Sequence, residues 1–269
     1  MPEERICVIG AGNMGEALTG GMITGGVARP EEITVHDIRR EQLDRFRETL
    51  HVGVSEEIGT ALEAADIVIL AVKPQNMEEV LRRMADTVAN RLVISIAAGI
   101  TLGFIEEILG EKARVVRVMP NTPALIGEGA TALAGGRNAT KDDVATARRI
   151  FGSVGMTVVV EEELIDAVTG LSGSGPAYGF LIIEALAQAG IDQGLEAEDA
   201  LKLAAQTMLG AAKLCLKGDR TPAQLTDMVT SPGGTTVEGI KALRAGKIGE
   251  TIAAAVEAAT QRSKELGRK

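Results

Sequence analysis

The stretch ICVIGAGNMG at residues 6–15 decides which fold this chain adopts. Its four apolar residues at 6–9 predict a short buried strand, and the glycines that follow form the pattern G-x-G-x-x-G at the start of a predicted helix. In such a loop the first glycine permits a tight turn, the second lets the backbone approach a pyrophosphate, and the third allows close packing of helix on strand. The alternative is a purely structural glycine turn. We predict a dinucleotide site formed by Gly10, Ala11, Gly12, Asn13, Met14 and Gly15.

An acidic residue supports this interpretation, because Asp37 ends the second predicted strand, residues 33–36. A carboxylate at this place usually binds the adenine ribose and so favours NADH. Arg39 and Arg40 follow at once, and a pair of guanidinium groups suits the 2′-phosphate of NADPH. The alternative for the arginines is a solvated helix start. We therefore predict that the site accepts NADPH or NADH, with Asp37 and Arg39 at its adenosine end.

The rest of the first half alternates apolar strand patterns with helical patterns. Further strands are predicted at 67–72, 92–97, 115–119, 131–134 and 157–160. Residues 67–72 are apolar at every position, as a strand buried on both faces is, and 92–97 and 115–119 are similar. Strands separated by helices imply a parallel, doubly wound sheet. The predicted fold class is α/β, with a Rossmann-type dinucleotide-binding domain over residues 1–161.

Three loops follow the predicted strands at the edge where ligands bind in such sheets. AVKP closes one strand, AAG closes the next, and MPNTP follows the strand at 115–119. Small residues suit a backbone that lies beside a nicotinamide ring, and the polar side chains of MPNTP suit contacts with the ring or the substrate. The predicted cofactor contacts are Ala71, Val72, Lys73 and Pro74, then Ala97, Ala98 and Gly99, then Asn121, Thr122 and Pro123.

The pattern of apolar residues changes after about residue 161, where strand patterns end and alanine-rich and leucine-rich helical patterns begin. Several of these helices are apolar over most of their circumference, for example at residues 181–186 and 203–214. A small helical domain cannot bury that much apolar surface alone, whereas packing against a second copy would. We predict an all-α domain over residues 162–269 that forms a homodimer.

A glycine-rich loop, TSPGGTT at 230–236, interrupts the helical half. Gly233 and Gly234 supply backbone freedom, and Thr235 and Thr236 are predicted to cap the helix that follows. A helix start with bare N–H groups is also an anion site. The alternative is a simple tight turn between helices.

The composition argues against several other functions. The net charge is −9 and aromatic residues make up only 2% of the chain, so we expect neither a nucleic acid nor an anionic membrane as partner. Two histidines and no cysteine cluster leave little to bind a metal. Cys7 and Cys215 are expected to be buried, unpaired thiols, which favours the cytoplasm. No apolar stretch is long enough to span a membrane, and the N-terminus leads straight into a strand without a signal peptide.

Taken in order, GAGNMG, AVKP, AAG, MPNTP, GLSGSGPAY (170–178) and TSPGGTT resemble the pyrroline-5-carboxylate reductase family over nearly the whole chain. The last two motifs are the most specific, because dinucleotide-binding domains in general lack them. The resemblance implies that NAD(P)H delivers hydride to the C=N carbon of 1-pyrroline-5-carboxylate, giving L-proline. It also implies a helical domain that interlocks with a second subunit, an active site between one subunit's nucleotide domain and its partner's helices, and assembly into larger oligomers such as decamers.

The resemblance further implies roles for the glycine-rich loop. Backbone N–H groups at 234–236 would hold the substrate carboxylate, and the Thr236 hydroxyl would bond the ring nitrogen as the catalytic group. Little acid–base chemistry is needed, because a protonated imine is already electrophilic and the cofactor supplies the hydride. One departure is that SEEIGTALEAAD, before the AVKP strand, lacks an asparagine that some relatives carry. The implied substrate-binding residues are Glu162, Ser231, Gly233, Gly234, Thr235 and Thr236.

Two other functions fit parts of the sequence. A related dehydrogenase for a β-hydroxyacid or another imine would place a catalytic lysine on a helix of the second domain, but Lys202, Lys213 and Lys217 lie in no recognisable motif. A non-catalytic NAD(P)-binding sensor would tolerate a degraded substrate loop, yet TSPGGTT is intact. The reductase is therefore the favoured interpretation.

Overall fold

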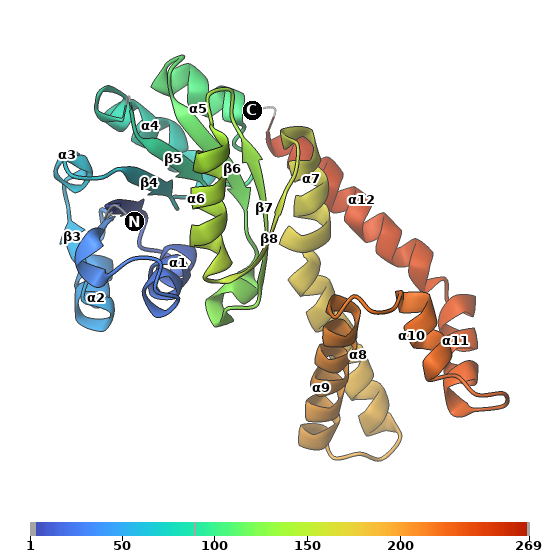
Figure 1. Cartoon of the computed structure of the whole chain (residues 1–269). Helices are drawn as coiled ribbons and strands as arrows, with labels where there is room; N and C mark the ends of the chain where they lie inside the picture. The colour runs from blue at the N-terminus through green and yellow to red at the C-terminus, as the bar shows by residue number, and fades with distance from the viewer. Residues whose placement is uncertain (1–3, 89, 268–269) are drawn as a thin grey trace. The chain divides into compact units, whose positions relative to one another are not determined.

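The computed structural model describes residues 4–88 and 90–267 (Figure 1). Its internal contacts divide the chain into two compact units. The first unit contains the residues up to Ser174 together with those from Glu257 onward, and the second is Gly175–Val256. Residues 162–174 and the end of the last helix therefore pack with the sheet, whereas the change in sequence pattern predicted a domain boundary between residues 161 and 162.

A single eight-stranded sheet organises the first unit, with the strand order β3-β2-β1-β4-β5-β6-β7-β8. The central strand β1 pairs in parallel with β2 and with β4, so that Ile6 lies beside both Ile33 and Ile67. Strands β1 and β4 are apolar at every position, which explains why they are buried on both faces. The strand bounds are β1 Ile6–Ile9, β2 Ile33–His36, β3 Gly53–Ser55, β4 Ile67–Leu70, β5 Leu92–Ser95, β6 Arg114–Met119, β7 Gly129–Gly135 and β8 Gly155–Val159.

The prediction of a wholly parallel sheet is wrong for the last two strands. Strand β7 runs antiparallel to β6, and β8 pairs in parallel with β7, so both run opposite to the other six. The reason is the connection after β6, which contains only the short 3₁₀ helix η4 (Thr122–Ile126) and a left-handed glycine, Gly127. A parallel neighbour needs a long crossover, whereas a short link folds the chain back. The edge strand β3 was not predicted, because it is only three residues long and begins with glycine.

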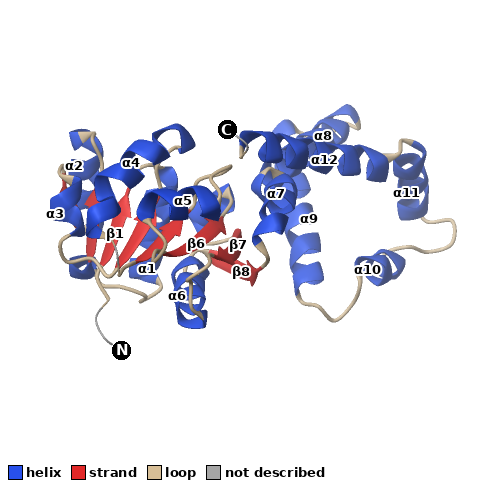
Figure 2. Cartoon of the chain, turned by 90° about the horizontal axis from the view of Figure 1, so that it is seen from above, coloured by secondary structure: helices blue, strands red, loops and turns tan. Residues whose placement is uncertain are grey.

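Helices cover both faces of the sheet (Figure 2). On one face Leu18, Phe46 and Phe151 share a core cluster with side chains of the central strands. On the other face Leu62, Leu81 and Ile105 close a second core. The first face carries α1 Asn13–Thr24, α2 Arg40–Leu50 and α6 Lys141–Gly152, and the second carries α3 Ile58–Leu62, α4 Met77–Met84, α5 Leu102–Leu109 and α7 Ile165–Val168.

The second unit is helical, as predicted, but it has almost no core of its own. Helices α8 (Gly175–Asp192) and α9 (Ala197–Leu216) form a hairpin, and the buried apolar residues described in them are the alanines 187, 200 and 204. Large apolar side chains stay exposed within the chain, among them Phe180, Leu181, Leu203, Leu209 and Leu214. The remaining helices are α10 Pro222–Met228, α11 Thr235–Ala245 and α12 Ile248–Leu266, whose last turns belong to the first unit.

The two cysteines differ from one another. Cys7 lies in β1 and is fully buried, and this burial raises the pKa of its thiol to about 12, with a smaller opposing effect from Arg91. Cys215 lies in α9 and is exposed, so the prediction that both thiols are buried is wrong within the single chain. It lies among the apolar side chains of the helical unit that the chain itself leaves uncovered. No helix among the described residues is long and apolar enough to cross a membrane.

Candidate nucleotide and substrate sites

The predicted cofactor loops meet at the carboxyl edge of the sheet. The N–H group of Gly10 donates to the carbonyl of His36 at 2.8 Å, and the N–H of Ala71 donates to Ile9 at 2.8 Å. The N–H of Ile96, next to the AAG loop, donates to the carbonyl of Leu70 at 3.1 Å. These bonds bring together the chain segments that follow β1, β2, β4 and β5. This is the edge at which open α/β sheets bind ligands.

The three glycines of GAGNMG have distinct structural reasons. Gly10 has a φ of 112°, and a Cβ there would lie 2.5 Å from the carbonyl oxygen of Ala71. A Cβ at Gly15 would collide with the carbonyl oxygen of Gly10, so helix and turn pack backbone to backbone. At Gly12, by contrast, a Cβ would meet nothing within 4 Å. Packing explains the first and the last glycine, and the open space at the middle one is what the close approach of a pyrophosphate requires.

Helix α1 begins directly after this open space. Its N-cap is Gly12, which has no side chain to satisfy the first N–H groups of the helix. Those groups and the positive end of the helix dipole form a site for a phosphate anion. The residues present therefore fit a dinucleotide cofactor, which when bound supplies the hydride for reduction.

Asp37 is tied to the glycine-rich loop and to Arg39. Its carboxylate accepts the N–H of Ala11 at 2.8 Å and the N–H of Arg39 at 2.9 Å, and the Arg39 guanidinium binds both carboxylate oxygens at 3.0 Å. Burial acts to raise the pKa of Asp37, but these bonds outweigh it, so the pKa lies below its ordinary value. The two predicted residues are therefore paired with each other, and the exposed Arg39 side chain covers the carboxylate.

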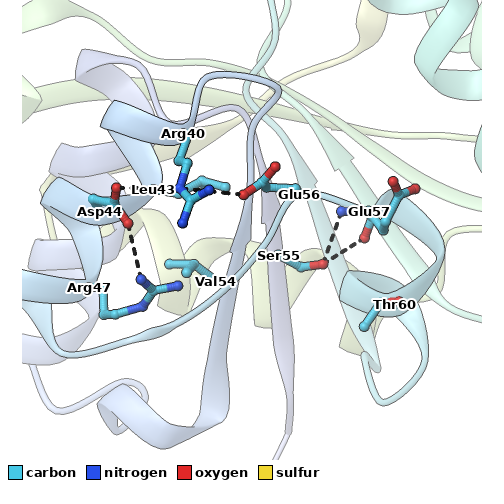
Figure 3. Close-up of a pocket in the computed structure, with 9 residues that line it drawn as sticks. All are labelled: Arg40, Leu43, Asp44, Arg47, Val54, Ser55, Glu56, Glu57 and Thr60. Atoms are coloured by element: carbon cyan, nitrogen blue, oxygen red, sulfur yellow. Dashed lines mark hydrogen bonds and ion pairs between the residues drawn. The ribbon is translucent and has the colours of Figure 1, made fainter.

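A joint contact of Arg39 and Arg40 with a 2′-phosphate stays a prediction. In this structure Arg40 has other ion-pair partners than Arg39. It faces a hollow of about 380 Å³ beside α2 and β3 (Figure 3). Its Nε atom lies 3.9 Å from oxygens of both Asp44 and Glu56. The two arginines diverge because Asp37 attracts one and the acidic wall of the hollow attracts the other. The hollow is lined by Arg40, Leu43, Asp44, Arg47, Val54, Ser55, Glu56, Glu57 and Thr60.

The next two loops differ in burial. In AVKP the Lys73 side chain is exposed, and Pro74 begins the 3₁₀ helix η2 (Pro74–Asn76) that turns the chain into α4. In AAG, Ala97 is 5% exposed, and Gly99 has a φ of 76°, which favours glycine. The small residues thus shape the backbone of a loop that has few side chains of its own to hold it.

The MPNTP loop is joined to the GLSGSGPAY motif. The side-chain nitrogen of Asn121 donates to the carbonyl of Ser172 at 3.0 Å, and its oxygen accepts the N–H of Ala130 at 2.8 Å. A Cβ at Gly173 would lie 2.8 Å from the end of the Met119 side chain, so this glycine permits the close contact. The segment Thr169–Gly173 is a π-helix, a geometry often found at functional sites. Asn121 was predicted to contact the ligand, but in this structure both ends of its side chain hold protein backbone.

The exposed Thr122 and the adjacent Pro123 begin η4, which packs against α1. MPNTP therefore lies beside the helix that starts at the glycine-rich loop. The contact between MPNTP and the π-helix could not be found from the sequence, because nothing in the spacing of the two motifs indicates that they touch.

Glu162 links the same region to α5. One of its carboxylate oxygens accepts the N–H of Leu102 at 2.7 Å and a guanidinium hydrogen of Arg117 at 2.9 Å. Arg117 is only 4% exposed and was missed by the sequence analysis, although an arginine inside an otherwise apolar strand is a signal of a buried partner. These bonds give Glu162 a structural task at the first turn of α5. A substrate contact for Glu162 stays a prediction.

The TSPGGTT loop lies in the second unit, and it confirms one expectation and corrects another. Gly233 has a φ of 73°, and a Cβ at Gly234 would lie 2.5 Å from the Oγ atom of Ser231. The N-cap of α11 is Gly234, so the prediction that Thr235 and Thr236 cap the helix is wrong. The side-chain oxygen of a threonine at the N-cap would have accepted a hydrogen bond from one of the N–H groups that glycine leaves without a partner. The first N–H groups of an eleven-residue helix are thus free of a side-chain cap.

Together these features define a class of protein. The strand order, the open space at Gly12, the uncapped start of α1 and the Asp37 carboxylate describe a dinucleotide-dependent oxidoreductase. In agreement, residues 5–99 match the family model "NADP oxidoreductase coenzyme F420-dependent", and residues 162–266 match the model "Pyrroline-5-carboxylate reductase dimerisation".

Comparison with known proteins identifies the family. A pyrroline-5-carboxylate reductase of Methanosarcina acetivorans is 47% identical over 100% of both chains. The structure of a pyrroline-5-carboxylate reductase from Coxiella burnetii matches with a TM-score of 0.95 and 40% identity, covering 99% of this chain and 100% of that one. A Plasmodium falciparum pyrroline carboxylate reductase with NADP bound matches with a TM-score of 0.88 and 32% identity over 99% of both chains. This chain belongs to the pyrroline-5-carboxylate reductase family, and the protein is an NAD(P)-dependent oxidoreductase with a helical dimerisation domain.

Proposed function

We propose that this protein reduces 1-pyrroline-5-carboxylate to L-proline with NADPH or NADH, the last step of proline biosynthesis. The observation that carries the proposal is the end-to-end similarity to reductases of this name, including the helical half. The family model for the helical half, over residues 162–266, is specific to the dimerisation domain of this family.

The chain's own residues have a modest chemical task. The cofactor, when bound, supplies hydride to the imine carbon, so the protein has to bind and orient the two reactants. We assign the substrate carboxylate to the bare N–H groups at the start of α11, from Gly234 to Thr236. Those groups are bare because Gly234 at the N-cap has no side chain to bond them, and a side chain there would press on Ser231.

Thr236 is the proposed catalytic residue. It is the second residue of α11 and is partly exposed, and it makes no hydrogen bond through its hydroxyl with the described residues. A hydroxyl in that state is available to accept a hydrogen bond from the N–H group of a protonated imine or to donate one to the product amine. It would orient the ring nitrogen while the start of the helix holds the carboxylate. Ser231, Gly233, Thr235 and Glu162 complete the proposed substrate set.

A direct assay tests the proposal. The purified protein should oxidise NADPH or NADH, followed by the absorbance of the reduced nicotinamide, only when 1-pyrroline-5-carboxylate is added, and L-proline should accumulate in equal amount. Acetoacetate and β-hydroxyacids assayed in both directions serve as controls for the related dehydrogenases. Turnover of a hydroxyacid without turnover of the cyclic imine would contradict the proposal.

The cofactor contacts are proposed at the residues that gather at the carboxyl edge of the sheet. Asp37 and Arg39 form its adenosine end, where the ion pair occupies both Asp37 oxygens and leaves the Nη1 group of Arg39 for a phosphate. Replacing Asp37 with Ala should weaken NADH more than NADPH, because the ribose loses an acceptor while Arg39 is released for the phosphate. Fluorescence titration of both reduced cofactors measures this, and unchanged NADH affinity would contradict the assignment.

Assembly and location complete the proposal. We infer a functional division into residues 1–161 and 162–269, with dimerisation through the second part and further association into a decamer. The exposed apolar side chains of α8 and α9 support a large interface. Light scattering of the purified protein determines the number of subunits. The unpaired thiols Cys7 and Cys215 favour the cytoplasm.

A further inference from the structure

The C-terminal turn of α12, residues 263–267, lies against the AAG loop. A Cβ added at Gly99 would lie 3.2 Å from the Cβ of Leu266, and one added at Gly267 would lie 3.2 Å from the carbonyl oxygen of Gly99. Both values are shorter than an ordinary van der Waals contact between carbon atoms or between carbon and oxygen. The two backbones therefore pack directly on one another, with no side chain between them.

A second contact fixes the same turn from another side. Ser263 is buried, with 3% of its surface exposed, unlike the other described residues of α12. Its hydroxyl donates to a carboxylate oxygen of Asp166 at 2.5 Å. Asp166 follows Ile165, which belongs to the same core cluster as Ala97. The end of α12 is thus attached to α7 and to the loop after β5, while most of the helix remains exposed.

The loop has a physical need for this support. Ala97, Ala98 and Gly99 have two methyl groups and no polar side chain with which to hold the loop. Gly99 adopts a left-handed conformation, and glycine can also adopt many others. A loop of this kind samples several conformations unless a neighbour packs on it. Restricting it before binding lowers the entropy that a ligand must offset.

We propose that the C-terminal turn of α12 positions the 97–99 loop and thereby sets the affinity of the protein for the nicotinamide half of NAD(P)H. Ser263 and Gly267 are positioning residues, because they act through the loop. The inference rests on the proposed cofactor role of Ala97, Ala98 and Gly99. It assigns a function in cofactor binding to a segment that lies more than 160 residues along the chain from that loop.

The test is the substitution Gly267→Ala. Gly267 does not have a positive φ, so its backbone accepts alanine, but the new Cβ presses on the carbonyl of Gly99. The dissociation constant of NADPH, measured by fluorescence titration, should rise about fivefold, within the range by which packed neighbours change binding at a site. The dissociation constant of 2′-phospho-ADP-ribose, which lacks nicotinamide, should stay unchanged in calorimetry. Ser263→Ala should act in the same direction.

Two further variants serve as controls. Gly249→Ala adds the same methyl group to the same helix where it meets nothing within 4 Å, so both dissociation constants should match those of the unmodified protein. Asp166→Asn keeps an oxygen that accepts the Ser263 hydroxyl, so it should bind NADPH more tightly than Asp166→Ala does. Amide exchange at residues 97–100 should quicken in Gly267→Ala and not in Gly249→Ala.

The outcomes separate this inference from the proposed function. If Gly99→Ala weakens NADPH while Gly267→Ala and Ser263→Ala do not, the loop binds cofactor but α12 does not position it, and the inference is overturned. If Gly99→Ala itself leaves NADPH affinity unchanged, the proposed role of the loop is wrong and the inference falls with it. Equal weakening of NADPH and 2′-phospho-ADP-ribose would also overturn it, because the effect would not be confined to the nicotinamide half.

Discussion

The sheet unit and the helical unit treat their apolar residues in opposite ways. In the sheet unit, strands such as β4 are buried along their whole length between two layers of helices. In the helical unit, Leu181, Leu203 and Leu214 are 64%, 57% and 54% exposed, and only small residues are buried. The first unit supplies its own core, whereas the second leaves an apolar surface exposed, as is typical of a surface that packs against another molecule. Its stability is therefore linked to assembly.

Glycine also has different structural roles in the two units. At Gly10 and Gly15 of the sheet unit, a side chain would strike backbone atoms of the protein itself. At Gly12 there is room for a side chain, and the proposed pyrophosphate contact requires that room. In the helical unit, Gly233 provides a left-handed turn and Gly234 leaves the start of α11 uncapped. The comparison predicts which substitutions affect folding and which affect only binding.

The largest expected effect comes from placing charge on the exposed apolar surface of the helical unit. The double variant Leu203→Asp and Leu209→Asp should prevent assembly and abolish turnover, because each unpaired charge would cost several kcal/mol to bury in an apolar interface. Light scattering measures the change in mass. Ile38→Asp, at a side chain of the sheet unit that is 79% exposed, is the matched control and should leave the mass unchanged. An intact oligomer in the double variant would contradict the contrast between the units.

The next effect separates two glycines of one loop. Gly15→Ala should destabilise the protein by about 3 kcal/mol, because the new Cβ strikes the carbonyl of Gly10. Gly12→Ala should leave the melting temperature unchanged and weaken NADPH by about tenfold or more, since its Cβ occupies only the open space. Calorimetry and fluorescence titration measure the two properties. A Gly12→Ala protein that binds NADPH normally would show that the open space is not the cofactor site.

A smaller effect concerns the proposed catalytic hydroxyl. Thr236→Ala should lower kcat about tenfold, which corresponds to the loss of one hydrogen bond to a charged group, about 1.4 kcal/mol. The dissociation constant of NADPH should stay nearly the same, because Thr236 belongs to the helical unit. Thr236→Ser retains the hydroxyl and should restore most of the turnover in steady-state assays. If Ser and Ala variants were equally slow, the hydroxyl would not be the functional group.

The smallest expected effect is a dependence of the free energy of unfolding on pH in the acid range. The hydrogen bonds of Asp37 hold its pKa below the ordinary value, so this carboxylate contributes stability that is fully present above its unfolded pKa, about 3.9. That contribution is lost as the pH falls from there through the lower pKa of the folded state. Asp37→Asn should therefore lose less stability than the unmodified protein over this acid range, in thermal melts at a series of pH values. Parallel acid profiles would contradict the assignment.

Much of the sheet unit could be predicted because local patterns determine it. Strands β1 and β2 begin and end at the predicted residues, and the glycine-rich loop opens α1 as expected. The reversed direction of β7 was missed, since it depends on the length of a connection and not on the apolar pattern. The short edge strand β3 was missed because its sequence, GVS, has almost no pattern to read.

At the candidate site the positions of the loops could be predicted from the sequence, whereas their side-chain contacts could not. The spacing of the motifs correctly predicted that the loops lie at the carboxyl edge of the sheet. It did not reveal that Asn121 holds the π-helix, that Glu162 binds Arg117, or that Asp37 and Arg39 bind each other. These are long-range or competing side-chain contacts, which depend on the folded arrangement. The start of α11 shows the same limit, because threonine is a good N-cap in general and yet Gly234 takes that position.

We propose that the uncapped start of α11 holds the carboxylate of the small cyclic acid while the reduced nucleotide binds at the carboxyl edge of the sheet. A crystal structure of the protein with NADP⁺ and L-proline tests it most directly. We expect the proline carboxylate within hydrogen-bond distance of the N–H groups between Gly234 and Thr236, and the pyrophosphate beside Gly12. A proline carboxylate bound at any other place in the protein would contradict the account.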